Sequence, residues 1–235
     1  IEPEIISATI DAFKYPGGYN VSCNGYSNGS VSIKTVAGGN GGYRYKWSTI
    51  NGFISGPDTL TRLDNITAGT YYLNVKDRKG CENTFSVVLT NPPGMTLTGS
   101  VLSNSPDGNF NISCKGGNEG SIDMTISGGS GSYTYLWTGP NGFSATTKYI
   151  SGLKAGVYIC TVLDVNGCEL RSMPASTLPT FTLTEPATLA INSTTSTSIS
   201  GGYNINCNNG TGTINLSVTG GSTGNYTYVW STTNG

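Results

Sequence analysis

One short motif, Tyr-x-Tyr-x-Trp, occurs three times and constrains the fold more than any other feature of the sequence. Its copies end at Trp47, Trp137 and Trp230, which are all of the Trp residues in the chain. In an extended strand, residues two and four positions apart point to the same face, so the three rings of each copy share one side. The motif therefore predicts a half-buried β-strand whose aromatic side, including these three Trp residues, lies in a core.

The spacing of the copies predicts the size of the domains. The Trp residues recur 90 and 93 residues apart, and Cys23, Cys114 and Cys207 recur in step at 91 and 93. Such a period exceeds the roughly 20–50 residues of a solenoid repeat and is close to a β-sandwich of about 100 residues. We expect an all-β chain of tandem immunoglobulin-like or PKD-like β-sandwich repeats, at residues 1–92 and 93–187, with the first half of a third at 188–235.

The composition narrows the class of protein. Gly accounts for 34 of 235 residues, about twice the ordinary usage of roughly 7%, and it clusters at turns between the predicted strands. Charged residues are only 11% and the formal net charge is −1, which argues against nucleic acid and anionic membranes as partners, because both demand clustered Lys and Arg. No apolar run approaches the roughly 18 residues of a membrane span, so we expect no membrane insertion.

Catalysis and metal binding find little support in the sequence. Histidine is absent, which removes the commonest general base and the imidazole metal ligands. No pair of carboxylates recurs at a spacing typical of glycosidases, and no calcium-loop motif occurs. Gly-rich stretches such as 38–42 lack a following Lys-Ser/Thr, so hairpin turns are favoured over phosphate binding. We expect no enzymatic activity and no cofactor.

Two positions recur along the strand that follows an Ala-Gly pair. Tyr71 and Tyr158 lie at the strand start, as in the tyrosine corner of sandwich domains. Asp77 and Asp164 lie at the strand end, where a turn cap is favoured over a single calcium ligand. The Tyr and Trp residues sit at core periodicity, which favours packing over stacking on sugars.

Together these motifs resemble one family. The stretches are Cys-Asn-Gly…Asn-Gly-Ser-Val at 23–31, Gly-Gly…Tyr-x-Tyr-x-Trp at 38–47, Asn-Gly-Phe at 51–53, and Ala-Gly-Thr-Tyr…Val-x-Asp-x-x-Gly-Cys at 68–81 with a closing Pro. They are similar to the SprB repeat, and the likeness covers two full repeats and part of a third. The departures are the extra Cys160 and the missing end of the third unit.

The resemblance implies a function without implying catalytic residues. SprB repeats occur in very large surface adhesins of gliding Bacteroidota, which the type IX secretion system exports and a motor carries along the cell. We expect an extracellular, outer-membrane-associated filament region that tethers the cell to a surface. The implied partners are an extracellular surface or polysaccharide, neighbouring repeats, and the secretion and gliding machinery. The alternative is an array of carbohydrate-binding or spacer modules attached to a secreted enzyme, which a recurring patch of exposed aromatic residues would favour.

The six cysteines form no Cys-x-x-Cys pair and indicate an oxidising compartment. We predict disulfides Cys23–Cys81 and Cys114–Cys168, with Cys160 a buried free thiol because it replaces Leu73. Four strands between Cys23 and Cys81, at 30–36, 43–49, about 59–63 and 70–77, would bring both to one end of the sandwich. The five strands of a regular immunoglobulin order would separate them. The rival pairing is Cys114–Cys160, and Cys207 has no predicted partner.

Two further expectations concern a loop and the boundaries. Asp58-Thr59-Leu60 fits the Asp-Ser/Thr-apolar motif for O-glycosylation in Bacteroidota, which makes Thr59 a candidate for modification. Prolines at 92–93 and at 186 predict short, stiff linkers, and the opening Ile1-Glu2-Pro3 resembles Thr184-Glu185-Pro186. We therefore expect part of a longer array that acts as a jointed, load-bearing rod, with two complete repeats spanning about 80 Å.

Overall fold

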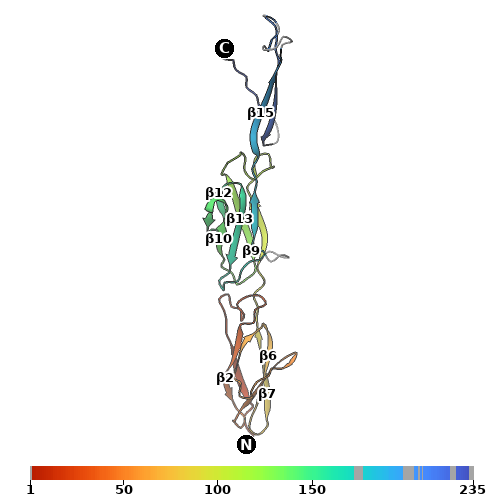
Figure 1. Cartoon of the computed structure of the whole chain (residues 1–235). Coiled ribbons are helices and arrows are strands. Elements are labelled where there is room, and N and C mark those ends of the chain that lie inside the picture. Colours follow the sequence, from red (N-terminus) through yellow and green to blue (C-terminus); the bar gives the residue numbers. More distant parts are fainter. Residues whose placement is uncertain are drawn as a thin grey trace. The chain divides into compact units, whose positions relative to one another are not determined.

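The computed structural model describes residues 2–171, 177–197, 204–205, 207, 209–222 and 226–232. Over these residues the regular structure is β-strand, apart from one 3-10 turn, η1 (Pro140–Gly142) (Figure 1). Antiparallel pairing joins strands into several separate small sheets. The predicted all-β class, built of immunoglobulin-like sandwich repeats, is confirmed.

The first repeat forms two sheets, with the strand orders β1-β2-β5 and β4-β3-β6-β7. The strands are β1 (Ser7–Ala12), β2 (Gly29–Ala37), β3 (Arg44–Thr49), β4 (Gly52–Phe53), β5 (Arg62–Ile66), β6 (Gly69–Lys76) and β7 (Glu82–Leu89). Burial on β6 alternates, because Tyr71, Leu73 and Val75 face inward. They pack with Trp47 and Val31 in one core between the two sheets, as the sequence predicted.

The second repeat has the same topology, with sheets β8-β9-β12 and β11-β10-β13-β14. Its strands are β8 (Thr96–Leu102), β9 (Gly120–Ser127), β10 (Thr134–Thr138), β11 (Ser144–Ala145), β12 (Ile150–Leu153), β13 (Gly156–Leu163) and β14 (Thr180–Leu183). The predicted core residues Trp137, Tyr158, Cys160 and Val162 are all buried.

The third repeat contributes one antiparallel pair, β15 (Ala187–Thr195) and β16 (Ile214–Gly221). Both strands are largely exposed along their length. Ile214, for example, is exposed, whereas its counterparts Val31 and Ile122 are buried. An alternating strand sequence is therefore not sufficient to form a core here.

One strand differs from the sequence prediction, and it changes the geometry of the cysteines. The Ile50-Asn51 turn closes a hairpin in which β4 pairs with the end of β3, and the strand expected near 59–63 lies at 62–66. Five strands, not four, therefore separate Cys23 from Cys81. Cys23 lies before β2, while the turn of Cys81 contacts Asn40, which follows β2. The two cysteines lie at opposite ends of the first sandwich.

Packing divides the chain into two compact units. The first comprises Ile1–Gly99, Thr125–Leu136 and Cys160–Pro179, and the second comprises Ser100–Met124, Trp137–Ile159 and Thr180–Gly235. Cys23 and Cys168 both belong to the first unit, whereas Cys114 and the third repeat belong to the second. The domain boundaries that the repeat period suggests, at 92/93 and 187/188, stay predictions.

Candidate functional site

Each repeat carries an early cysteine, before its second strand (Cys23, Cys114 and Cys207), and the two complete repeats carry a late one, Cys81 or Cys168. The late cysteine lies in a turn built around a buried aspartate. Asp77 Oδ1 accepts hydrogen bonds from the backbone N–H groups of Lys79 (2.8 Å) and Cys81 (3.0 Å). Asp164 Oδ1 accepts from Asn166 and Cys168 at 2.9 and 3.0 Å. Asp77 and Asp164 are therefore turn caps, as the sequence favoured.

The second oxygen of the aspartate ties the late turn to the Gly-rich turn between the second and third strands of the repeat. Asp77 Oδ2 accepts from the backbone and the side chain of Asn40 at 2.8 and 2.7 Å. Burial by itself would raise the pKa of Asp77, but the hydrogen bonds from Asn40, Lys79 and Cys81 outweigh it and lower the pKa well below its usual value. The carboxylate stays ionised and fixes the position of the late cysteine.

The early cysteine lies in a turn that is tied to the end of its own repeat. The buried Asn20 accepts hydrogen bonds through Oδ1 from the backbone (2.9 Å) and hydroxyl (3.0 Å) of Thr90, and donates through Nδ2 to Phe13 O. Asn24 donates to Pro92 O at 2.9 Å. Asn111 repeats the bonds of Asn20 with Thr184. The early cysteine is thus presented where one repeat leads into the next.

The structure joins the early cysteine of the first repeat to the late cysteine of the second. Cys23 and Cys168 form a disulfide with their Cα atoms 5.6 Å apart, 145 residues apart in sequence. The predicted Cys23–Cys81 and Cys114–Cys168 pairs are therefore not formed, and the rival Cys114–Cys160 is not formed either. The physical reason is the extra strand β4, which places the two cysteines of one repeat at opposite ends.

Polar contacts surround this disulfide within the first compact unit. Asn166, in the late turn of the second repeat, donates through Nδ2 to Pro16 O (3.0 Å) and to Ser130 Oγ (2.8 Å). Gly17 has φ +90°, and a Cβ on it would lie 2.8 Å from Ser130 Cβ. Only glycine combines this backbone conformation with so close an approach. The disulfide therefore belongs to a packed junction, which we call the cysteine junction.

The remaining four cysteines are unpaired. Cys160 is buried on β13, as predicted from its replacement of Leu73, and burial raises the pKa of its thiol to about 12. Such a thiol is almost entirely protonated at neutral pH and reacts poorly. Cys81, Cys114 and Cys207 are exposed.

The core aromatic residues behave alike in the two complete repeats and differently in the third. Trp47 and Trp137 are 2% and 0% exposed, and each donates Nε1–H to a loop carbonyl, of Leu60 or Thr147. The hydroxyls of Tyr71 and Tyr158 donate to the carbonyl four residues earlier, which completes the predicted tyrosine corner. Trp230 is 62% exposed, so its predicted core position is wrong. In the first repeat the strand that contains Tyr71 lies beside the aromatic strand and places Leu73 opposite Trp47.

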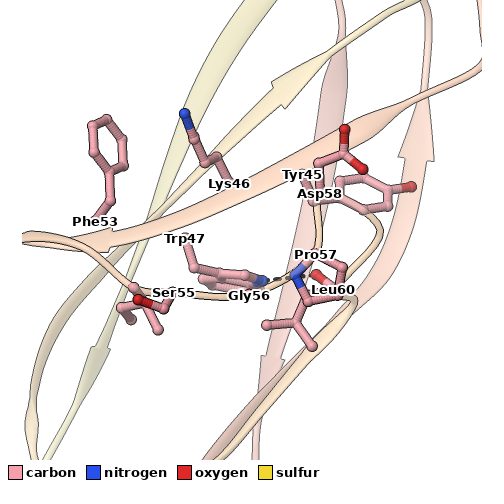
Figure 2. A pocket seen from close by; sticks show the side chains of 10 residues that line it. Tyr45, Lys46, Trp47, Phe53, Ser55, Gly56, Pro57, Asp58 and Leu60 are labelled. Atoms are coloured by element: carbon pink, nitrogen blue, oxygen red, sulfur yellow. Dashed lines mark hydrogen bonds between the residues drawn. The ribbon is translucent and has the colours of Figure 1, made fainter.

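A shallow surface pocket lies next to the first of these Trp residues (Figure 2). Figure 2 shows the Trp47 ring beside the segment from Ser55 to Leu60, with the Nε1–H bond to Leu60 as a dashed line. At its edge the Lys46 ammonium lies 4.7 Å from the centroid of the exposed Phe53 ring. This arrangement does not recur, because Leu136 replaces Lys46 and Phe143 packs edge-on against Tyr158. The Lys46–Phe53 contact at the edge of the pocket therefore has no counterpart in the second repeat.

Thr59 is the remaining candidate site residue of the sequence analysis. Thr59 is exposed in a turn next to Asp58, and its modification stays a prediction. Across the residues that the structure describes, no group of three or more His, Cys, Asp or Glu side chains lies together in a way that could hold a metal ion. No helix in the described part of the chain is long and apolar enough to cross a membrane.

Sequence reasoning missed three residues of the cysteine junction. Gly17, Asn20 and Asn166 bring the early and late turns into place, but each lies in a loop that has no periodic pattern. For two of them the available signal was recurrence, since Asn20 and Asn111 precede the early cysteine by three residues and Gly108 corresponds to Gly17. Asn166 gave no such signal, because Lys79 occupies its position in the first repeat.

The fold and the cysteine junction define a class of protein, a tandem array of immunoglobulin-like β-sandwich repeats. The chain is a member of the SprB-repeat family, because the SprB repeat model matches residues 19–52, 111–142 and 203–235. SprB repeats are found in cell-surface proteins, which makes this chain an adhesin-like surface module. No curated protein matches its sequence.

Two solved structures are similar at low sequence identity. The three N-terminal domains of the bacteriophage RB49 highly immunogenic outer capsid protein (Hoc) share 12% identity, with a TM-score of 0.44 over 93% of this chain and 71% of that one. A complex of Dpr2 Ig1-Ig2 with DIP-Theta Ig1-Ig3 gives 13% identity and a TM-score of 0.30, over 82% and 74% of the respective chains.

Proposed function

We propose that this region is a non-enzymatic, load-bearing part of a cell-surface adhesin filament that tethers the cell to a surface during gliding. Membership of the SprB-repeat family supports an extracellular, outer-membrane-associated location and export by type IX secretion. The observation that carries the proposal is the Cys23–Cys168 bond. It gives consecutive repeats a second covalent connection in addition to the polypeptide backbone.

The cysteine junction supports the mechanical part of the proposal. When the chain is pulled from its two ends, force that arrives at Cys23 crosses the disulfide to Cys168. Residues 24–167 then lie outside the path of the force. While the disulfide is intact, this segment cannot contribute its roughly 500 Å of extended length. A tether built in this way can carry tension without unravelling its sandwich cores.

Single-molecule extension tests the mechanical part. The oxidised chain, held at its ends, should unfold to a contour length about 500 Å shorter than that of Cys23→Ser. Cys114→Ser is the matched control, because it removes an exposed thiol outside the force-bearing bond and should leave the contour length unchanged. Equal contour lengths for the oxidised chain and Cys23→Ser would contradict a load-bearing junction.

Labelling of living cells tests the tethering part. Antibody fragments raised against residues 1–235 should bind intact cells of the source organism, move along the cell surface and block attachment to glass. Bound label that stays fixed on moving cells would count against a role in gliding.

The alternative, a carbohydrate-binding array attached to a secreted enzyme, depends on exposed aromatic residues that recur. The two Trp side chains of the complete repeats are buried, and the 72% exposed Phe53 has a packed counterpart in Phe143. These observations favour the tether. A glycan array probed with the chain separates the two, since saturable sugar binding that is lost in Phe53→Ala would support the alternative.

A further inference from the structure

The surface pocket beside Cys114 corresponds to the pocket beside the Cys23–Cys168 bond. Both pockets contain the early cysteine and the residue after it, a boundary proline, an apolar side chain and a glycine of the following Gly-rich turn. The corresponding residues are Cys23 and Cys114, Asn24 and Lys115, Pro92 and Pro186, Met95 and Leu189, and Gly129 and Gly221. At the first pocket the late turn of the next repeat, with Asp164 and Cys168, forms the remaining wall.

One hydrogen bond that closes the Gly-rich turn recurs among the described residues of the third repeat. Tyr226 donates its hydroxyl to Gly220 O at 2.7 Å, as Tyr43 and Tyr133 do to Gly38 O and Gly128 O. Next to this turn, Ser222 donates to Asp107. Asp107 and Ser222 occupy the positions of Pro16 and Ser130, the two residues that Asn166 bridges at the first junction.

The late cysteine is also presented in the same way in both complete repeats. Asp77 N donates to Cys81 O at 2.9 Å and Asp164 N donates to Cys168 O at 3.0 Å. A glycine with positive φ precedes each cysteine, namely Gly80 and Gly167. Cys81 therefore has the backbone setting of Cys168, but its thiol is exposed and unpaired.

We propose that the bond between Cys23 and Cys168 is one link of a ladder, in which the early cysteine of each repeat pairs with the late cysteine of the next. Cys114 is then the bonding partner of the late cysteine of the third repeat. That cysteine would lie in an Asp-x-x-Gly-Cys turn that follows the aromatic strand. Cys81 would form the corresponding disulfide with the early cysteine of a repeat placed before residue 1. Pairing within one repeat is excluded by the separation of its two cysteines to opposite ends of the sandwich.

The chemistry of each link is an oxidation of two thiols. The two sulfur–hydrogen bonds break, one sulfur–sulfur bond forms, and two electrons and two protons pass to a disulfide-form oxidant, either an oxidoreductase or oxidised glutathione, which becomes a dithiol or two thiols. These disulfides are part of the covalent structure of the array, whether or not the array tethers gliding cells.

The test extends the full chain. A copy of residues 53–92 is added directly after Gly235, which restores the Asn-Gly-Phe order and supplies a copy of Cys81. After refolding in a glutathione redox buffer, peptide mapping without reduction should find Cys114 bonded to the added late cysteine. Maleimide labelling of Cys114, complete in residues 1–235, should be lost. In a control extension that carries Cys81→Ser in the added copy, labelling of Cys114 should return.

Trp230 reports independently on folding of the completed repeat, because its fluorescence should shift to shorter wavelength when the new strands bury it. Labelling of Cys114 in an extended chain with a buried Trp230 would overturn the proposal. So would a bond between the added cysteine and Cys207. A second extension, residues 143–186 carrying Cys160→Leu, repeats the test with a different sequence, so the result does not depend on how well one extension folds.

Discussion

The aromatic strand motif is present in three repeats, buried in two of them and exposed in the third. Trp47 faces Leu73 across the β3–β6 ladder, and both side chains are buried in the first core. From residue 187 onward, β15 and β16 are the strands that the structure describes, and Trp230 lies outside them. The motif therefore determines which side of a strand is apolar, but the Gly-x-Tyr strand from the second half of the repeat supplies the surface that buries it.

This difference identifies the complete repeat as the unit of stability. In β15 and β16 the apolar residues Leu189, Ile191 and Ile214 remain exposed, although they alternate as in a sandwich strand. A two-stranded ladder alone cannot bury such side chains, and an isolated pair of strands is marginally stable in water. Matched substitutions in the complete and incomplete repeats can measure how much the missing strands contribute.

The largest expected effect comes from the Trp residues themselves. Trp47→Ala or Trp137→Ala leaves a large cavity and should lower the free energy of unfolding of its repeat by about 3–5 kcal/mol. Trp230→Ala should change it by less than about 0.5 kcal/mol, because the side chain is exposed. Chemical denaturation followed by circular dichroism measures both. Equal losses at Trp47 and Trp230 would show that the third repeat already has a core.

A smaller effect is expected for the asparagine that holds the early turn. Asn20→Ala leaves the Thr90 amide and the Phe13 carbonyl without their side-chain partner and should cost about 1–3 kcal/mol. Asn204, its exposed counterpart, donates to Thr195 Oγ1, and Asn204→Ala should cost less than about 0.5 kcal/mol. The same denaturation experiment applies. If the Asn20 variant matched the Asn204 variant, the early turn would not depend on this side chain.

The aspartate cap at Asp77 gives the first repeat a dependence on pH. The pKa of Asp77 is lower in the folded than in the unfolded chain, so its contribution to stability is fully present above the unfolded value of about 3.9. That contribution is lost as the pH falls through the lower folded pKa. Asp77→Asn should therefore flatten the loss of stability between neutral pH and acid. Thr59→Ala, which removes an exposed side chain without changing any titratable group, is the control and should leave the slope unchanged. If the free energy of unfolding fell equally steeply with decreasing pH in Asp77→Asn and in the unsubstituted chain, the Asp77 cap would not be the source of the pH dependence.

The smallest effect on stability is expected at Thr59. Its side chain is exposed, so Thr59→Ala should change the free energy of unfolding by less than about 0.5 kcal/mol. Mass spectrometry of the protein from its native source should nonetheless show a glycan on the peptide that contains Thr59, and on no equivalent peptide of the second repeat. An unmodified Thr59 would remove this distinction between the repeats.

The sequence was sufficient to predict the features that depend on periodicity. The aromatic strands, the tyrosine corner and the turn caps at Asp77 and Asp164 all follow from spacing within one strand. The hairpin strand β4 could not be predicted, because Gly52 and Phe53 are too few to show alternation. The cysteine pairing depended on that strand. It was ambiguous for a second reason, since in a regular array the same cysteine spacing fits pairing within a repeat and pairing between neighbours.

The separation of the early and late cysteines to opposite ends of one sandwich also affects how the gene can change in length. A duplication or deletion of one whole period adds or removes one early and one late cysteine together. The repeats on either side of the change then still meet as an early–late pair. An insertion that ended halfway through a period would instead leave an unmatched thiol and an uncovered Trp. The position of the bond therefore favours variation in copy number by whole repeats.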